Sequence, residues 1–213
     1  GMTAGTPEFI QGLRKACDEH GLLLAFDEVQ TGMGRTGDLF AYKRVGVTPD
    51  VMSLAKALGG GFPIGAVLAT AKAAEGMAPG SHGSTFGGNP LACAVARAAL
   101  RVLVDEGMIE NAAVQGARFL DGLRSIRANI VREVRGRGLM RGEGLLIGVK
   151  AVVPSGDLIA ALRNEKLLTV GAGDNVVRFL APLIVTEAEI DQSIGSLERA
   201  CATLSAAQPR KAG

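Results

Sequence analysis

A short apolar run, Leu22 to Phe26, constrains the fold of this chain more than any other feature. It contains no polar residue and ends in the acidic pair Asp27-Glu28. A run that is apolar throughout, instead of alternately apolar and polar, is typical of a strand in a parallel sheet with both faces covered. A helical pattern precedes it, beginning at Thr6-Pro7-Glu8 and ending at Gly21. The sequence therefore predicts an α/β fold.

Two further strands are predicted in the same half of the chain, at Val51 to Leu54 and Gly65 to Ala69. The connection between them contains Lys56 and three consecutive glycines, Gly59–Gly61. Polar groups thus gather where strands end. In open α/β sheets the loops beyond the carboxyl ends of the strands form the ligand-binding crevice, so we expect the site there. A helix from Leu91 to about Val104, capped by Asn89, follows.

The second half of the chain has the pattern of a smaller α/β unit. Helices are predicted at Asn111 to Ala128 and Gly156 to Lys166, with strands at Leu145 to Val149, Leu168 to Val170 and Val176 to Leu180. Thr186 and Glu189 have the spacing of a capping box that begins a last helix. We therefore expect two domains, residues 1–106 and 107–213.

Composition excludes several classes of function. A net charge of +2 is too small for a protein that binds nucleic acid through a basic surface. The longest apolar stretch, Leu91 to Val104, is interrupted by Arg97 and Arg101, so no membrane span is expected. Three widely spaced cysteines have neither metal-ligand nor disulfide-framework spacing, which predicts a cytoplasmic protein without a metal site.

Three segments carry a family resemblance: residues 26–32 (FDEVQTG), 53–61 (SLAKALGGG) and 82–90 (HGSTFGGNP). Their sequences, order and separations resemble those of the class III pyridoxal-phosphate (PLP) dependent aminotransferases. The resemblance continues through residues 134–140, 152–154 and 171–178, almost to the end of the chain. It implies part of the large domain of a PLP-transferase of fold type I, followed by the small C-terminal α/β domain.

Within this resemblance, Lys56 corresponds to the lysine that holds PLP covalently and moves the substrate proton. Asp27 corresponds to the carboxylate that keeps the pyridine nitrogen protonated. Taken without the family, Lys56 would be a solvated surface lysine. Asp27 would be a loop carboxylate that pairs with Arg35 or caps a helix.

The resemblance also assigns roles to residues outside this pair. Gln30 would hydrogen-bond the phenolic oxygen of PLP, and Glu28 and Val29 would complete the cofactor-binding segment. Thr85 would bind the phosphate of the neighbouring subunit's PLP and Ser84 the substrate there, which implies a homodimer. Arg178 would bind the substrate carboxylate as a bidentate donor. Alone, Ser84-Thr85 is an ordinary turn and Arg178 a solvent-facing strand residue.

The activity implied is transamination between N-acetylornithine and 2-oxoglutarate in arginine biosynthesis. Related ornithine, succinyl-diaminopimelate or 4-aminobutyrate aminotransferases are the alternatives, together with a PLP aminomutase of the same fold. In the family, the phosphate-binding loop and the aromatic residue stacked on the ring precede the region matched here. We therefore expect the chain alone not to turn over substrate, and a catalytically silent fragment remains a further alternative.

Strand order gives two more expectations. In the resembled fold, the strand ending at Asp27 pairs with the strand before Lys56, which pairs with Gly65 to Ala69. This predicts a three-stranded sheet, parallel then antiparallel, with both outer edges unpaired. A tandem repeat, Arg135–Met140 and Arg141–Leu146, is expected to form a surface turn, with a phosphate-binding glycine loop as the alternative.

Overall fold

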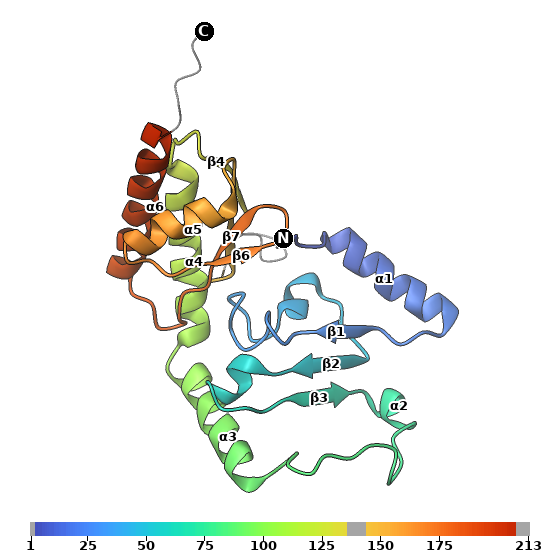
Figure 1. The fold of residues 1–213 in the computed structure, drawn as a ribbon. Helices are drawn as coiled ribbons and strands as arrows, with labels where there is room; N and C mark the ends of the chain where they lie inside the picture. The colour runs from blue at the N-terminus through green and yellow to red at the C-terminus, as the bar shows by residue number, and fades with distance from the viewer. Residues whose placement is uncertain (1–2, 136–143, 208–213) are drawn as a thin grey trace. The chain divides into compact units, whose positions relative to one another are not determined.

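A computed structural model describes residues 3–135 and 144–207 of the chain. They divide into two compact units, one of residues Gly5–Glu110 and the other of Asn111–Gly213 together with Gly1–Ala4 (Figure 1). The repeat at residues 135–146 falls largely on positions 136–143, outside the described residues. Each unit is described by itself below.

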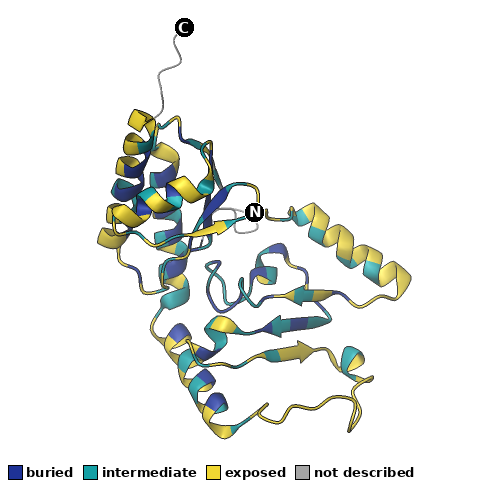
Figure 2. Ribbon diagram, in the orientation of Figure 1, coloured by how far each residue is buried: buried dark blue, intermediate teal, exposed yellow. Residues whose placement is uncertain are grey.

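The first unit begins with helix α1, Pro7–His20. The hydroxyl of Thr6 accepts a hydrogen bond from the Phe9 N–H at 3.2 Å, and Gly21 ends the helix at a φ of 65°. Both predicted helix ends are confirmed. No residue of α1 is buried (Figure 2). An ion pair of 2.7 Å between Arg14 and Asp50 attaches the helix to the start of a strand.

The sheet of this unit has three strands, β1 (Ala25–Asp27), β2 (Val51–Leu54) and β3 (Ala66–Ala69), in that order. β1 and β2 are parallel, whereas β2 and β3 are antiparallel. The predicted order and directions are confirmed. Within the described part of the chain, the outer edges of β1 and β3 have no partner strand.

The connections of this sheet contain most of its irregular structure. A short 3₁₀ helix, η1 (Ala41–Val45), lies between β1 and β2, and a second, η2 (Lys56–Gly59), follows β2. Helix α2 is a single turn, Ala71–Ala74. Helix α3 (Pro90–Asp105) begins where the Asn89 side chain accepts the Ala92 N–H at 2.9 Å, and it packs against η2.

The second unit is a four-stranded antiparallel sheet with three helices on one side (Figure 1). The strand order is β4-β5-β7-β6. The strands are β4 (Val131–Arg135), β5 (Ile147–Ala151), β6 (Val170–Ala172) and β7 (Val176–Phe179). The helices are α4 (Met108–Ser125), α5 (Ser155–Asn164) and α6 (Glu187–Ala207).

All three helices of the second unit contribute to one apolar core with β5 and β7. Fully enclosed side chains include Leu123 of α4, Leu158 and Leu162 of α5, and Leu197 of α6. Each buried leucine side chain contributes about 1.5–3 kcal/mol to the stability of the fold, so these contacts hold the helices on the sheet. Cys201 also lies in this core, where burial raises the pKa of its thiol to about 11.

Candidate functional site

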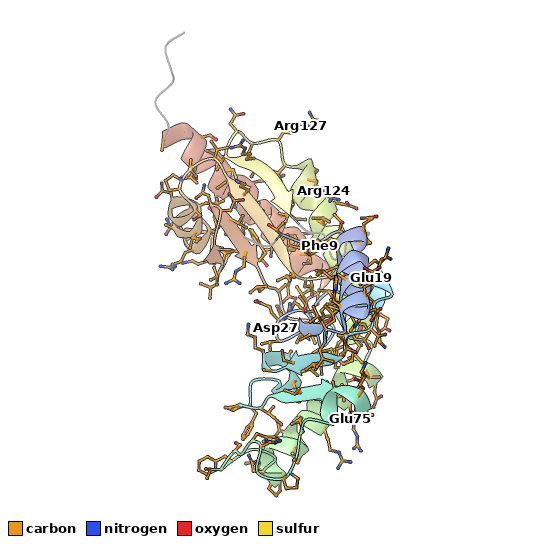
Figure 3. All side chains as sticks on the ribbon, turned by 90° about the vertical axis from the view of Figure 1, so that its right-hand side faces the viewer. Phe9, Glu19, Asp27, Glu75, Arg124 and Arg127 are labelled. Carbon is orange, nitrogen blue, oxygen red and sulfur yellow. The ribbon has the colours of Figure 1, made fainter. Side chains whose placement is uncertain are left out.

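Asp27 and Lys56 lie at neighbouring strand ends. Asp27 is the last residue of β1 and stands opposite Ser53 of β2 in the parallel register (Figure 3). Lys56 begins η2, two residues beyond the end of β2. Because parallel strands place their carboxyl ends at one edge of a sheet, this topology assembles both residues from segments almost thirty positions apart in sequence.

The backbone at Lys56 is left-handed, with a φ of 46°. A residue other than glycine rarely adopts this conformation, and it costs on the order of 1–3 kcal/mol where it occurs. The turn that follows also depends on glycine. A Cβ at Gly59 would lie 2.8 Å from Cγ2 of Ile64, and Gly60 ends η2 at a φ of 57°. These residues hold Lys56 at the surface, where its side chain is exposed.

Three polar side chains near this edge, those of Asp27, Gln30 and Lys56, have at most one hydrogen-bond partner in the part of the chain that the structure describes. Among the described residues, the Lys56 ammonium makes no hydrogen bond or ion pair, and neither does the side-chain amide of Gln30. The exposed carboxylate of Asp27 accepts only the Val29 N–H, at 2.9 Å, from this part of the chain. One ammonium, one carboxylate and one amide are therefore available to a ligand.

Glu28 differs from its neighbours, since its side chain is 3% exposed. Its carboxylate accepts hydrogen bonds from the Thr31 hydroxyl at 2.6 Å and from the backbone N–H groups of Ala41 and Tyr42 at 3.1 and 2.9 Å. The carboxylate is thus committed to its own loop. This arrangement could not be predicted from the sequence, because nothing local to residues 26–32 indicates that residues 41 and 42 fold back onto Glu28.

Ser84 and Thr85 lie in the long exposed segment before α3. The Ser84 hydroxyl accepts the Gly87 N–H at 2.9 Å and closes a small turn. Within residues 3–135 and 144–207, the Thr85 hydroxyl has no hydrogen-bond partner. The Thr85 hydroxyl is therefore free to bind a ligand, whereas the Ser84 hydroxyl already accepts one hydrogen bond within its own turn.

Arg178 belongs to the other compact unit, in the middle of β7. It stands opposite Val170 of β6 and Gly148 of β5, and its side chain is half-buried. Its Nε is buried and has no hydrogen-bond partner among the described residues. A half-buried guanidinium with an unpaired N–H is suited to a carboxylate ligand.

The described residues form no cluster of three or more His, Cys, Asp or Glu side chains that could hold a metal ion. None of the helices in residues 3–135 and 144–207 is long and apolar enough to cross a membrane.

The family model of aminotransferase class III matches residues 1–201. The chain belongs to the class III aminotransferases. This family is PLP-dependent. Acetylornithine aminotransferase 1 of Bradyrhizobium diazoefficiens is 66% identical to this chain over 215 aligned residues. The alignment covers all of this chain and 52% of that protein. The chain thus spans about half the length of the curated relatives it matches and resembles their C-terminal portion.

Solved structures of class III aminotransferases have the same fold of type I. N-acetylornithine aminotransferase of Stenotrophomonas maltophilia is 40% identical, with a TM-score of 0.82 over 97% of this chain and 54% of that one. Ornithine aminotransferase of Toxoplasma gondii is 35% identical, with a TM-score of 0.88 over 97% of this chain and 49% of that one. The latter structure is described as showing partial occupancy of PLP at its active site.

The residues of this class III chain fit PLP. Its aldehyde requires an accessible amine, and the Lys56 ammonium is exposed and without a partner in the described residues. Its pyridine nitrogen requires a carboxylate, and the Asp27 carboxylate has no cationic partner there. Its phenolic oxygen accepts a donor such as the Gln30 amide, which makes no hydrogen bond within the described residues.

Proposed function

We propose that this chain is the cofactor-anchoring part of an enzyme that transfers an amino group from N-acetylornithine to 2-oxoglutarate in arginine biosynthesis. The observation that carries the proposal is the 66% identity, over the whole chain, to a protein named acetylornithine aminotransferase 1. Two features of the structure support it: the neighbouring ends of β1 and β2, and the side chains of Asp27, Gln30 and Lys56, which contact no other side chain through a hydrogen bond or ion pair in the described residues.

Bound PLP supplies an electron sink that stabilises negative charge on the substrate Cα. Lys56 Nζ would hold the cofactor covalently, and its amine would carry the proton that leaves Cα. The Asp27 carboxylate holds a proton on the pyridine nitrogen, and the Gln30 amide donates to the phenolic oxygen. Glu28 and Val29 keep these two side chains on one short segment, in which the Val29 N–H also fixes the Asp27 carboxylate.

Three further roles belong to the proposal. Arg178 binds the substrate carboxylate through its planar guanidinium, whose buried Nε lacks a partner in the described chain. Thr85 binds the phosphate of PLP held by a second copy of the chain, and Ser84 contacts the substrate there. The enzyme is accordingly a homodimer. We also place it in the cytoplasm and assign residues 1–106 to the large domain and 107–213 to the small one.

The experiment joins this chain behind the N-terminal portion of the Bradyrhizobium relative, which supplies the rest of that protein's length. Purified protein is tested for the visible absorbance of lysine-bound PLP and for glutamate formation from 2-oxoglutarate with N-acetylornithine, ornithine, succinyl-diaminopimelate or 4-aminobutyrate. We expect N-acetylornithine to have the highest kcat/KM. Lys56→Ala should remove both the absorbance and the activity.

Lys72→Ala is the matched control, because Lys72 is another exposed lysine of the same unit. It should leave absorbance and turnover unchanged. Persistence of the absorbance in Lys56→Ala would exclude Lys56 as the attachment point. Preference for another amino donor would retain the family chemistry and reject the assignment of substrate.

A further inference from the structure

The buried carboxylate of Glu28 closes the segment that follows β1. Its three donors come from both ends of that segment, Thr31 near the beginning and Ala41 and Tyr42 where the chain enters η1. Hydrogen bonds to a charged acceptor contribute roughly twice as much as neutral ones. The carboxylate therefore joins two stretches of chain that no strand pairing connects.

The backbone of Glu28 is fixed as well. Its N–H donates to the Ser53 carbonyl at 3.0 Å, next to the last β1–β2 pair, Asp27 with Ser53. Its carbonyl accepts the Gly32 N–H at 2.9 Å. A Cβ at Gly32 would lie 2.9 Å from that same oxygen, so this turn depends on glycine. Glu28 is thus held through its N–H, its carbonyl and its side chain.

Two residues close to Glu28 have polar side chains that remain available to a ligand in the described structure. Asp27 precedes it directly and Gln30 follows two positions later. The directions of these side chains depend on the backbone between them, and that backbone is set by the contacts of Glu28. We infer that Glu28 is a positioning residue, which does not touch the cofactor but fixes Asp27 and Gln30 beside Lys56. This inference rests on the proposed function.

A matched carboxylate lies at the other end of the same strands. Asp50 precedes β2 and accepts the Leu24 N–H at 2.8 Å and Arg14 at 2.7 Å. Like the Glu28 carboxylate, the Asp50 carboxylate accepts both backbone and side-chain donors and connects β1 to other segments. It does so at the amino ends of the strands. Amide substitution at each position therefore removes a comparable structural contact, and only Glu28 adjoins Asp27 and Gln30.

The test uses the chain joined behind the N-terminal portion of the Bradyrhizobium relative, as in the experiment above. PLP is added, borohydride converts its lysine linkages to stable secondary amines, and peptide mass spectrometry measures the label at Lys56 relative to the exposed reference lysines Lys15 and Lys166. In Glu28→Gln we expect this ratio to fall about tenfold, as for the loss of one charge-assisted contact. In Asp50→Asn the ratio should stay within about twofold of the parent.

A double-mutant cycle separates positioning from general loosening. If Glu28 acts through its neighbours, Glu28→Gln should lower the ratio much less in an Asp27→Asn, Gln30→Ala background than in the parent. Equal losses in both backgrounds would overturn the inference. Circular dichroism shows whether each variant is folded. If Glu28→Gln is not, Thr31→Val, which removes one donor, takes its place with a smaller expected loss.

The remaining outcomes are also decisive. In one outcome, Lys56 is labelled preferentially in the parent and to the same extent in Glu28→Gln. This result would overturn the inference and leave the proposed function standing. No preference for Lys56 in the parent would contradict the assigned attachment point, and the inference would fall with it.

Discussion

Asn175 caps a helix to which it does not belong. Its Oδ1 accepts the backbone N–H of Ser155, the first residue of α5, at 2.7 Å. The residue at the N-cap position is Pro154, whose side chain offers no acceptor. The amide of Asn175 also donates to the carbonyl oxygens of Ala151 and Val153, at 2.9 and 2.7 Å. One side chain thus connects β5, the start of α5 and the turn before β7.

Asn175→Ala should be among the more destabilising single substitutions in the second unit. It removes three hydrogen bonds of about 1 kcal/mol each and places alanine at a φ of 55°, so we expect a loss of about 2–4 kcal/mol. Asn175→Gly loses the same bonds but tolerates the backbone, and it should be less destabilising. Urea denaturation measures both. Equal stabilities for the two variants would show that the left-handed backbone contributes nothing.

Gly116 and Gly122, both in α4, give a paired prediction about packing. A Cβ at Gly116 would lie 2.5 Å from the carbonyl oxygen of Gly144, a backbone atom that cannot move by itself. A Cβ at Gly122 would contact Cδ1 of Ile194, the free end of a flexible side chain.

We expect Gly116→Ala to lower the free energy of unfolding by about 1–3 kcal/mol or more through overpacking. In Gly122→Ala the side chain can rotate away. A gain in helix propensity of about 0.5–1 kcal/mol should then offset the remaining strain. Thermal unfolding of the two variants against the parent makes the comparison. A Gly116→Ala protein as stable as Gly122→Ala would mean that α4 can shift away from Gly144.

Helix starts with a capping side chain were the most predictable part of the fold, because their signals are local. The uncapped helix predicted at Asn111 to Ala128 was displaced by three residues, since α4 is Met108–Ser125. Thr6, Asn89 and the Thr186–Glu189 pair were identified from the sequence, and each accepts the expected backbone N–H. A cap requires only a side chain within three residues of an unpaired donor. No distant part of the chain has to be known.

Strands were less predictable. β4 was missed because its register shifts between Val131 and Glu133, which interrupts the regular alternation of apolar and polar side chains along the strand. Val131 and Val134, an odd number of positions apart, consequently both pack on the core. At the other end of the chain, the apolar run from Leu22 was expected to be a covered strand. β1 begins only at Ala25, and Leu22 and Leu23 are 58% and 53% exposed.

The candidate site was predictable where topology alone decides it. Parallel pairing of β1 with β2 is enough to bring the segments of Asp27 and Lys56 to one edge. The burial of Glu28 depends instead on how residues 31–42 fold back, and no short-range pattern encodes that path. The cofactor and substrate contacts of the individual side chains remain predictions.

The capping box of α6 predicts a dependence of stability on pH. The Glu189 carboxylate accepts the Thr186 N–H at 2.8 Å and the Thr186 hydroxyl at 2.8 Å. These bonds, the backbone one first, lower the pKa of Glu189 below its ordinary 4.5. A carboxyl whose pKa is lower in the folded state contributes its full stabilisation above the unfolded pKa and loses it as pH falls through the folded pKa.

Glu189→Gln should therefore cost stability near neutral pH, and the difference from the parent should shrink as pH falls below about 4.5. Urea denaturation at several pH values measures this difference. Glu198→Gln changes the same charge on the same helix without removing a hydrogen bond that the described residues show, so it is the control. A gap between Glu189→Gln and the parent that stays constant down to acidic pH would contradict the assignment.

The exposed edge of β3 predicts self-association of the chain. Val67 and Leu68 point to opposite faces of this strand because side chains alternate, and they are 67% and 46% exposed. Neither face of β3 is well covered, therefore, and its outer edge has no partner strand in the described structure (Figure 2). An apolar strand with a free edge is a template for pairing with another copy.

We expect the purified chain to elute as concentration-dependent oligomers, and Val67→Lys to shift it toward the monomer by placing a charge on the edge strand. Val114→Lys is the matched control, because Val114 of α4 is 64% exposed but lies on a helix with no free backbone edge. Sedimentation velocity over a range of concentrations distinguishes the three proteins. A parent chain that remains monomeric throughout, or an equal response to both lysine substitutions, would show that β3 does not direct the association.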